Sequence, residues 1–233
     1  MIIQIITCII FRQLFAESVI HLPLFWGISY FCIRPVQLPV CDYMIKKLEN
    51  RKWKVLESVK LLDKGTWMNL RQEKVQLPSG AIVPEWFILE FPDWVNVIAI
   101  TKDGQFVMED QYRHAIGETH YELVAGVVDP GETPLEAAKR ELSEETGYGG
   151  GEWSLFMKLS PNPTNHTNYS YTFLAVGVEP LRDQHLEATE DIHVDLFTKD
   201  EVRELLESGE LIQALHAAPL WKYFAMDQFK KRG

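Results

Sequence analysis

The chain has 233 residues, of which 46% are hydrophobic, and this is enough for one sizeable folded domain with a short extension. Its 33 acidic and 23 basic residues give a formal charge of −10 at pH 7, which disfavours nonspecific binding to nucleic acid, and we expect no nucleic-acid partner. The three cysteines, Cys8, Cys32 and Cys41, lie near the N-terminus, so the rest of the chain cannot depend on disulfides. This usage suits a reducing compartment and predicts a cytoplasmic protein.

The first 43 residues form an extension that is apolar, aromatic and nearly uncharged, unlike the rest of the chain. Two charges interrupt its apolar run and no basic region precedes it, which argues against a secretory signal. Pro23 and Gly27 weaken a membrane-spanning helix, so we expect no stable membrane association, although a membrane anchor remains an alternative. The favoured hypothesis is that translation begins at Met44. An intact mass of the native protein that includes residues 1–43 would contradict it.

Residues 44–94 are predicted to form an N-terminal region of antiparallel strands. Apolar and polar residues alternate from Lys54 to Leu77, as half-buried strands require, and a Pro-Ser-Gly turn follows. Further strands are predicted over 85–94, 95–101, 105–113 and 121–128.

The clearest helix pattern in the chain covers 133–146. Thr133 and Glu136 form a capping box, Pro134 suits the first helical turn, and Gly147 suits the C-terminal stop. The sequence therefore predicts both ends of this helix.

The C-terminal part of the chain contains both strand and helix patterns. Residues 149–153 are expected to form a flexible connection, followed by strands over 153–160, 170–178 and 194–198. Thr198 and Glu201 repeat the capping box, and 211–229 is predicted as a final amphipathic helix disturbed at Pro219. Many strands with few helices indicate an α+β fold with a mixed sheet packed between helices.

Three glutamates of the first helix, Glu141, Glu144 and Glu145, are spaced to share one side of it. Like charges at this spacing destabilise a helix by roughly 0.2–0.5 kcal/mol per pair, and by more where they are partly desolvated. Hard divalent cations such as Mg²⁺ take oxygen ligands and bridge carboxylates to phosphates, so they would compensate. An acidic run is also typical of a solvated helix face, so the wider pattern has to decide.

A longer pattern surrounds these glutamates. Gly126 is followed after five residues by Glu132, and after seven more by the run Arg-Glu-Leu-Ser-Glu-Glu-Thr-Gly-Tyr at 140–148. This resembles the Nudix box, Gly-x5-Glu-x7-Arg-Glu-U-x-Glu-Glu-x-Gly-U, with every specified letter present; the Tyr148 position is more often aliphatic. The resemblance implies a Nudix-type α/β/α sandwich over 95–233. It also implies a metal-dependent hydrolase that cleaves a nucleoside diphosphate linked to another group.

The resemblance also assigns roles to individual residues. The implied metal ligands are the Ala125 carbonyl oxygen, Glu141, Glu144, Glu145 and Glu190. The residues implied to shape the loop and helix are Gly126, Glu132, Arg140 and Gly147. The implied catalytic carboxylates are Glu144, Glu145, Glu187 and Glu190. Glu187 is the candidate base, with an ordinary solvated acidic loop as its alternative, and the implied cofactor is Mg²⁺ or Mn²⁺.

The segment QYRHAIGETHYELVAGVVDPGE is similar to ADP-ribose pyrophosphatases. In that subgroup an Arg follows the Gln-Tyr pair and a Glu precedes a segment ending Ala-Gly, which implies substrate-binding roles for Arg113 and Glu122. A guanidinium fits phosphate bidentately, although a surface Arg at a strand end is the plain alternative. The resemblance implies hydrolysis of ADP-ribose, a nucleotide-sugar substrate, to AMP and ribose 5-phosphate by a homodimer.

Two other functions remain open at this stage. One is hydrolysis of another sugar nucleotide, such as a GDP-sugar, and the other is a non-catalytic Nudix module that senses a ligand. The intact glutamates of the box argue against the second. Trp86, Phe87 and Trp94 are candidates to stack on a purine, although aromatic residues on predicted strands are more often core.

Overall fold

The structure is a computed structural model that describes residues 48–65 and 67–230. Every described helix and strand lies in the second of two compact units, Asn50–Gly233. The predicted extension over 1–43 and the expected start at Met44 lie outside the described residues. Within the described ranges, no helix is long and apolar enough to cross a membrane.

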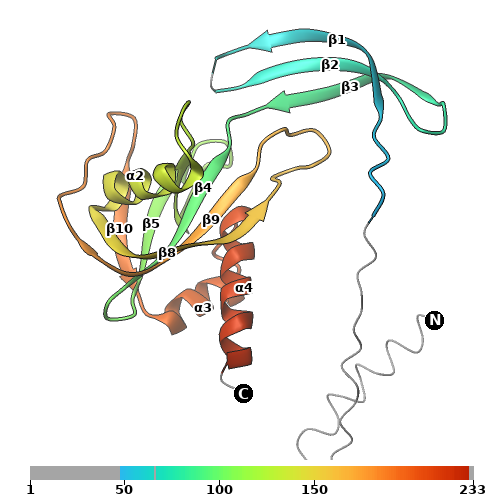
Figure 1. The fold of residues 1–233 in the computed structure, drawn as a ribbon. Coiled ribbons are helices and arrows are strands. Elements are labelled where there is room, and N and C mark those ends of the chain that lie inside the picture. The colour runs from blue at the N-terminus through green and yellow to red at the C-terminus, as the bar shows by residue number, and fades with distance from the viewer. Residues whose placement is uncertain (1–47, 66, 231–233) are drawn as a thin grey trace, which may run out of the picture. The chain divides into compact units, whose positions relative to one another are not determined.

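The first three strands form an antiparallel sheet in the order β1-β2-β3, as predicted (Figure 1). Their bounds are Lys54–Asp63 for β1, Asn69–Gln76 for β2 and Ile82–Glu90 for β3. The predicted strand over 85–94 is wrong at its end, because the chain leaves the sheet after Glu90. Pro92 follows, and a proline has no N–H to donate to a strand ladder.

A second sheet of seven strands follows the order β10-β5-β4-β9-β8, with β6 paired to β5 and β7 paired to β4. It is mixed, because β4 and β9 run parallel whereas the other pairs are antiparallel. The strand bounds are β4 Trp94–Thr101, β5 Phe106–Arg113, β6 Glu118–Glu122, β7 Val124–Val127, β8 Tyr148–Leu159, β9 Ser170–Pro180 and β10 Ile192–Phe197.

The predicted strand over 121–128 is two strands that separate at Leu123. β4 and β5 pair directly only at Ala99 and Ile100, and beyond that point β6 continues the pairing with β5 while β7 pairs with β4. The sheet is therefore split between β6, which extends the pairing of β5, and β7, which extends the pairing of β4. The Ala125 and Gly126 positions of the box lie on β7, at this division.

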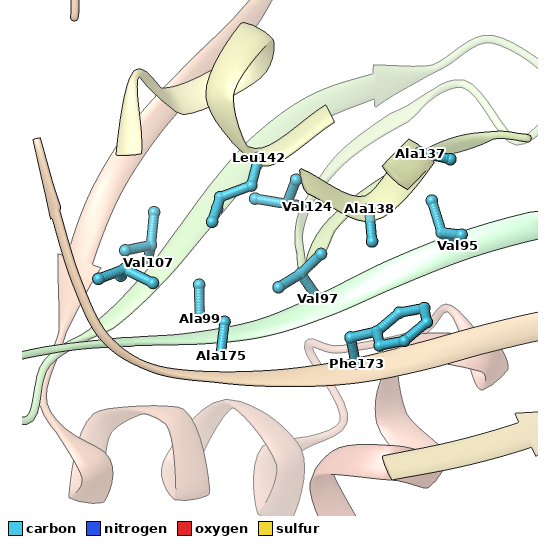
Figure 2. Close-up of a cluster of buried hydrophobic side chains, with 11 residues drawn as sticks. Val95, Val97, Ala99, Val107, Val124, Ala137, Ala138, Leu142, Phe173 and Ala175 are labelled. Atoms are coloured by element: carbon cyan, nitrogen blue, oxygen red, sulfur yellow. The ribbon is translucent and has the colours of Figure 1, made fainter. Parts of the chain in front are cut away.

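Helices cover both faces of the second sheet, which confirms the predicted α/β/α arrangement. Figure 1 shows α2 (Pro134–Thr146) on one face, and α3 (Lys199–Ser208) and α4 (Ala214–Lys230) on the other. Each buried aliphatic side chain stabilises the fold by roughly 1.5–3 kcal/mol. Figure 2 shows the core beneath α2, whose buried members are Val95, Val97, Ala99, Val107, Val124, Ala137, Ala138, Leu142, Phe173, Ala175 and Val178.

Both predicted ends of α2 are confirmed. The Thr133 hydroxyl accepts a hydrogen bond from the Glu136 N–H at 3.3 Å, and the Glu136 carboxylate accepts one from the Thr133 N–H at 2.8 Å. Gly147 ends the helix in the left-handed region with φ 75°. The flexible connection predicted over 149–153 is wrong, because β8 begins at Tyr148 and pairs with β9 through this segment.

The predicted disturbance at Pro219 is also wrong, since α4 is continuous through it. A proline inside a helix leaves the carbonyl four residues earlier without its N–H partner. Here that carbonyl belongs to Leu215, and the side-chain amide of the buried Asn96 on β4 donates to it at 2.9 Å. A tertiary hydrogen bond thus replaces the missing helical one.

Replacement of Gly147 by Ala is expected to lower the free energy of unfolding by about 3 kcal/mol. A Cβ atom would lie 2.2 Å from the backbone oxygen of Arg182, and the left-handed conformation would be strained as well. Gly150→Ala is the control, because Gly150 has a similar φ of 71° with open space around it, and we expect a loss of about 1 kcal/mol. Urea denaturation measures both losses, and an equal loss of unfolding free energy in the two variants would contradict the predicted clash.

Candidate functional site

A cleft of about 920 Å³ gathers most of the residues that the sequence singled out. Residues before β4, on β5, from β7 through α2, and in the 185–190 loop line it. Glu122, Glu132 and Gly147 are not among the lining residues. The predicted site residues that line it are Arg113, Ala125, Gly126, Arg140, Glu141, Glu144, Glu145, Glu187 and Glu190.

Arg140 joins the loop before α2 to the helix itself. Its Nε and Nη2 atoms donate to the two oxygens of Glu132 at 2.9 and 3.0 Å, and Nη2 also donates to the Val127 carbonyl at 3.0 Å. Its Nη1 atom reaches Glu141 at 2.9 Å and Glu144 at 3.2 Å. These hydrogen bonds raise the pKa of Arg140, and the guanidinium stays charged beside the cleft.

Gly126 provides the space that the Glu141 side chain occupies. A Cβ atom at position 126 would lie 2.0 Å from Glu141 Oε1 and 2.1 Å from its Cδ. The φ angle of Gly126 is outside the left-handed region, so close approach is the requirement for glycine here.

Glu141 and Glu145 are carboxylates at the edge of the core, with 9% and 5% of their surface exposed. Burial raises the pKa of Glu141 to about 7, and the charges of Glu144 and Glu190 add to this against the opposing effect of Arg140. Burial also raises the pKa of Glu145 to about 9, with the charges of Glu141 and Glu190 as further causes. A cation bound beside Glu141 and Glu145 would stabilise their ionised forms and so lower both pKa values.

The loop before β10 carries the two late glutamates to the same cleft. The Glu190 carboxylate accepts a hydrogen bond from the Glu187 N–H at 2.7 Å, and the Glu190 N–H donates to the Glu187 carbonyl at 3.0 Å. Glu190 lies within electrostatic range of Glu141 and Glu145. Glu187 lines the cleft beside them.

Arg113 and Glu122 form a bidentate ion pair across β5 and β6. Arg113 Nε and Nη2 donate to the two Glu122 oxygens at 2.8 and 2.5 Å. The Glu122 side chain is only 2% exposed, whereas that of Arg113 is 41% exposed and lines the cleft. Glu122 therefore contacts Arg113 from below the cleft surface, and its predicted role in substrate binding stays a prediction.

Comparison with known proteins identifies the family. The model of the NUDIX domain matches residues 91–215. The chain belongs to the Nudix family. The ADP-ribose pyrophosphatase of Bacillus subtilis is 31% identical over 151 residues, which cover 64% of this chain and 81% of that protein. The ADP-ribose pyrophosphatase of Mycobacterium tuberculosis is 30% identical over 165 residues, which cover 69% and 78%.

A solved structure supports the Nudix fold. The crystal structure of an ADP compounds hydrolase covers 80% of this chain and 99% of its own, with a TM-score of 0.66 and 20% sequence identity. The predicted α+β class and the predicted family are both confirmed.

Nudix hydrolases generally use divalent metal ions, and the donor atoms of this Nudix site fit such an ion. Carboxylate oxygens are the ligands that hard divalent cations prefer. Glu145 Oε2 is buried and has no hydrogen-bond partner among the described residues, so an oxygen ligand is free. In the part of the chain that the structure describes, no three His, Cys, Asp or Glu side chains already form a metal-binding group. Glu141 Oε1 and Glu144 Oε2 contact Arg140, which engages one oxygen of each carboxylate.

The sequence analysis did not single out Trp67, which lines the cleft of this Nudix site, or Glu109, a buried carboxylate that is not among the lining residues. Trp67, 80% exposed, lines the cleft from the connection between β1 and β2. Glu109, 1% exposed, lies on β5, and burial together with the charges of Glu145 and Glu122 raises its pKa well above the usual value. The signal for Glu109 was its place two residues after the apolar Val107, on the face that strand alternation buries.

The aromatic residues considered as purine platforms lie elsewhere. Trp86 packs edge-on against Trp53 at 5.3 Å between ring centroids, and Trp94 packs against Phe91 at 5.7 Å. Phe87 is 46% exposed. None of the three candidates lines the cleft.

Proposed function

We propose that this Nudix protein hydrolyses the pyrophosphate bond of ADP-ribose or a related nucleoside diphosphate sugar, giving AMP and a sugar phosphate. One observation carries the proposal: a guanidinium held by a buried carboxylate and the clustered box glutamates line the same cleft. A diphosphate needs both, a cation for its anionic oxygens and a fork of N–H donors. The similar proteins named ADP-ribose pyrophosphatase support this substrate class.

The cofactor that we propose is Mg²⁺, with Mn²⁺ as a substitute. The residues that would hold it are the Ala125 carbonyl oxygen, Glu141, Glu144, Glu145 and Glu190. When bound, the cation would neutralise charge on the pyrophosphate and lower the pKa of a coordinated water.

The chain's own residues would then position the substrate and deprotonate the attacking water. Arg113 would bind the diphosphate, and Glu122 would fix the orientation of Arg113. A water oxygen attacks one phosphorus as the bond from that phosphorus to the bridging oxygen breaks. Glu187 would accept the proton of that water, because it lines the cleft and its backbone is fixed by Glu190.

A panel of substrates with Mg²⁺ tests the substrate assignment. We expect ADP-ribose to be hydrolysed faster than GDP-mannose, with AMP as the nucleotide product. Faster hydrolysis of the GDP-sugar would replace the proposed substrate with another sugar nucleotide. Binding of ADP-ribose without hydrolysis of any panel member would favour the ligand-sensing module.

We also propose that the protein is a homodimer whose N-terminal region, 44–94, contributes the interface. β1 exposes Val55, Val59 and Leu61 by 50%, 57% and 48%. A row of exposed aliphatic side chains on one strand is typical of a surface that a partner covers.

Light scattering tests this proposal. Val59→Lys combined with Leu61→Lys is expected to give a monomer, because two desolvated ammonium groups would oppose association. Leu155→Lys, at a 57% exposed residue of β8, is the control and should remain a dimer. A monomeric unmodified protein, or a dimer of the double variant, would contradict the proposed interface.

The domain arrangement and the location are proposals as well. We propose that the hydrolase domain covers 95–233 and that the protein acts in the cytoplasm. The restriction of cysteine to positions 8, 32 and 41 supports a reducing compartment.

Gly126→Ala is expected to raise the Mg²⁺ concentration needed for half-maximal activity at least about tenfold, since a Cβ would displace the Glu141 carboxylate. The free energy of unfolding should change by less than about 1 kcal/mol, because the end of a flexible side chain can move. The matched control is Gly149→Ala, whose Cβ would meet only the Leu181 side chain, at 2.7 Å. An unchanged Mg²⁺ requirement in Gly126→Ala would contradict this account of the glycine.

A further inference from the structure

Glu109 is a buried carboxylate to which the proposed function assigns no role. It lies on β5 between Val107, a member of the core beneath α2, and Gln111, which lines the cleft. Residues two apart on a strand share a face, so the Glu109 side chain lies on the face of β5 that packs toward α2, between the core and the cleft-lining Gln111. Only 1% of its surface is exposed.

The charges around Glu109 are mainly negative. Its strongest charged neighbour is Glu145 of the box, and Glu122 lies opposite it in the pairing of β5 with β6. Arg113 is the cation among these neighbours, but two of its donors bind Glu122. The local balance is therefore an excess of carboxylates that the ion pair of Arg113 and Glu122 does not offset.

Two buried oxygens in this cluster have no hydrogen-bond partner among the described residues. They are Glu109 Oε2 and Glu145 Oε2. A buried carboxylate oxygen without a partner destabilises a fold unless a cation or a donor satisfies it. A proton shared between the two carboxyl groups would satisfy both oxygens but would leave one negative charge buried, whereas a divalent cation takes several oxygen ligands and neutralises both carboxylates.

We propose that Glu109 is a further ligand of the divalent cation, acting with Glu145 and lying outside the box helix. The inference rests on the proposed function for the presence of that cation. Glu109 would add an oxygen ligand from β5 to those from α2, so the cation would join this strand to this helix. Glu109 would also determine how tightly this chain binds its metal.

Binding of Mn²⁺ to the full-length protein tests the proposal, with the free ion measured by electron paramagnetic resonance. Glu109→Gln is expected to weaken Mn²⁺ binding at least about tenfold. The matched control is Asp110→Asn, which removes the same charge from the neighbouring β5 residue, whose partner is His193 on β10 at 3.4 Å. It should bind Mn²⁺ as the unmodified protein does.

Thermal melting without metal separates a ligand from a structural residue. Replacement of a buried ionisable group by a neutral isostere should leave the Tm of Glu109→Gln unchanged or higher, and the increase in Tm on adding Mn²⁺ should shrink. A lower metal-free Tm with unchanged Mn²⁺ affinity would overturn the proposal. In that case the proposed function would still be supported if the unmodified protein binds Mn²⁺ and Glu145→Gln does not.

A crystal of the unmodified protein grown with Mn²⁺ gives a second test that needs no variant. An anomalous peak within about 2.6 Å of a Glu109 carboxylate oxygen would support the proposal. A peak beside Glu145 but beyond bonding distance of Glu109 would overturn it. Absence of any Mn²⁺ binding in solution would overturn both this inference and the metal dependence on which it rests.

Discussion

Glu145→Gln is expected to lower Mg²⁺-dependent release of AMP from ADP-ribose on the order of a thousandfold or more. The substitution changes a carboxylate that is proposed as a metal ligand and whose buried Oε2 has no hydrogen-bond partner among the described residues. Cations contribute several kcal/mol to such reactions, and about 4 kcal/mol corresponds to a thousandfold in rate. The measurement is the initial rate in a coupled assay for AMP at saturating Mg²⁺.

The same substitution should not destabilise the metal-free protein. Burial and the charges of Glu141 and Glu190 raise the pKa of Glu145 to about 9, so folding near pH 7 requires its protonation, and the neutral glutamine removes that cost. Glu207→Gln, at an exposed glutamate of α3, is the control and should retain full activity. Activity of Glu145→Gln within tenfold of the unmodified protein would contradict the assigned role.

Arg113→Ala is expected to have two effects of different origin. It should lower kcat/KM roughly a hundredfold, because a charged hydrogen bond to phosphate contributes about 1.5–3 kcal/mol. It should also lower the free energy of unfolding by about 3 kcal/mol, because Glu122 remains buried without its guanidinium partner and keeps only His216 at 3.6 Å.

A double variant separates the two effects of Arg113. Arg113→Met with Glu122→Gln removes both charges and keeps similar volumes, so stability should return to within about 1 kcal/mol of the unmodified protein. Activity should stay low, since no guanidinium reaches the cleft. Recovery of kcat/KM in the stable double variant would show that Arg113 acts only through folding.

Local sequence signals predicted the helix and the loop that carry the box. The Thr133 capping box and the Gly147 stop are short-range hydrogen-bonding patterns, and a single segment of sequence determines them. The division between β6 and β7 was missed, because it depends on which neighbouring strand each half meets. The continuity of α4 through Pro219 was missed for the same reason, since Asn96 supplies the hydrogen bond from a distant strand.

In the candidate site, too, the features that depend on distant segments of the chain were missed. A motif at fixed spacing identifies Glu141, Glu144 and Glu145, because they lie on one helix. Glu109 lies on a strand far from the box in sequence, and only the pairing of β5 with β6 reveals its charged surroundings. The burial of Glu122 behind Arg113 likewise follows from tertiary packing.

Metal-dependent hydrolysis is tested by release of AMP from ADP-ribose by the full-length protein, measured with Mg²⁺ and again after removal of divalent cations with EDTA. We expect AMP and ribose 5-phosphate in equal amounts with Mg²⁺, and loss of this reaction after chelation. Equal rates in the two conditions, or no AMP with Mg²⁺ from a protein that melts cooperatively, would contradict metal-dependent hydrolysis of ADP-ribose.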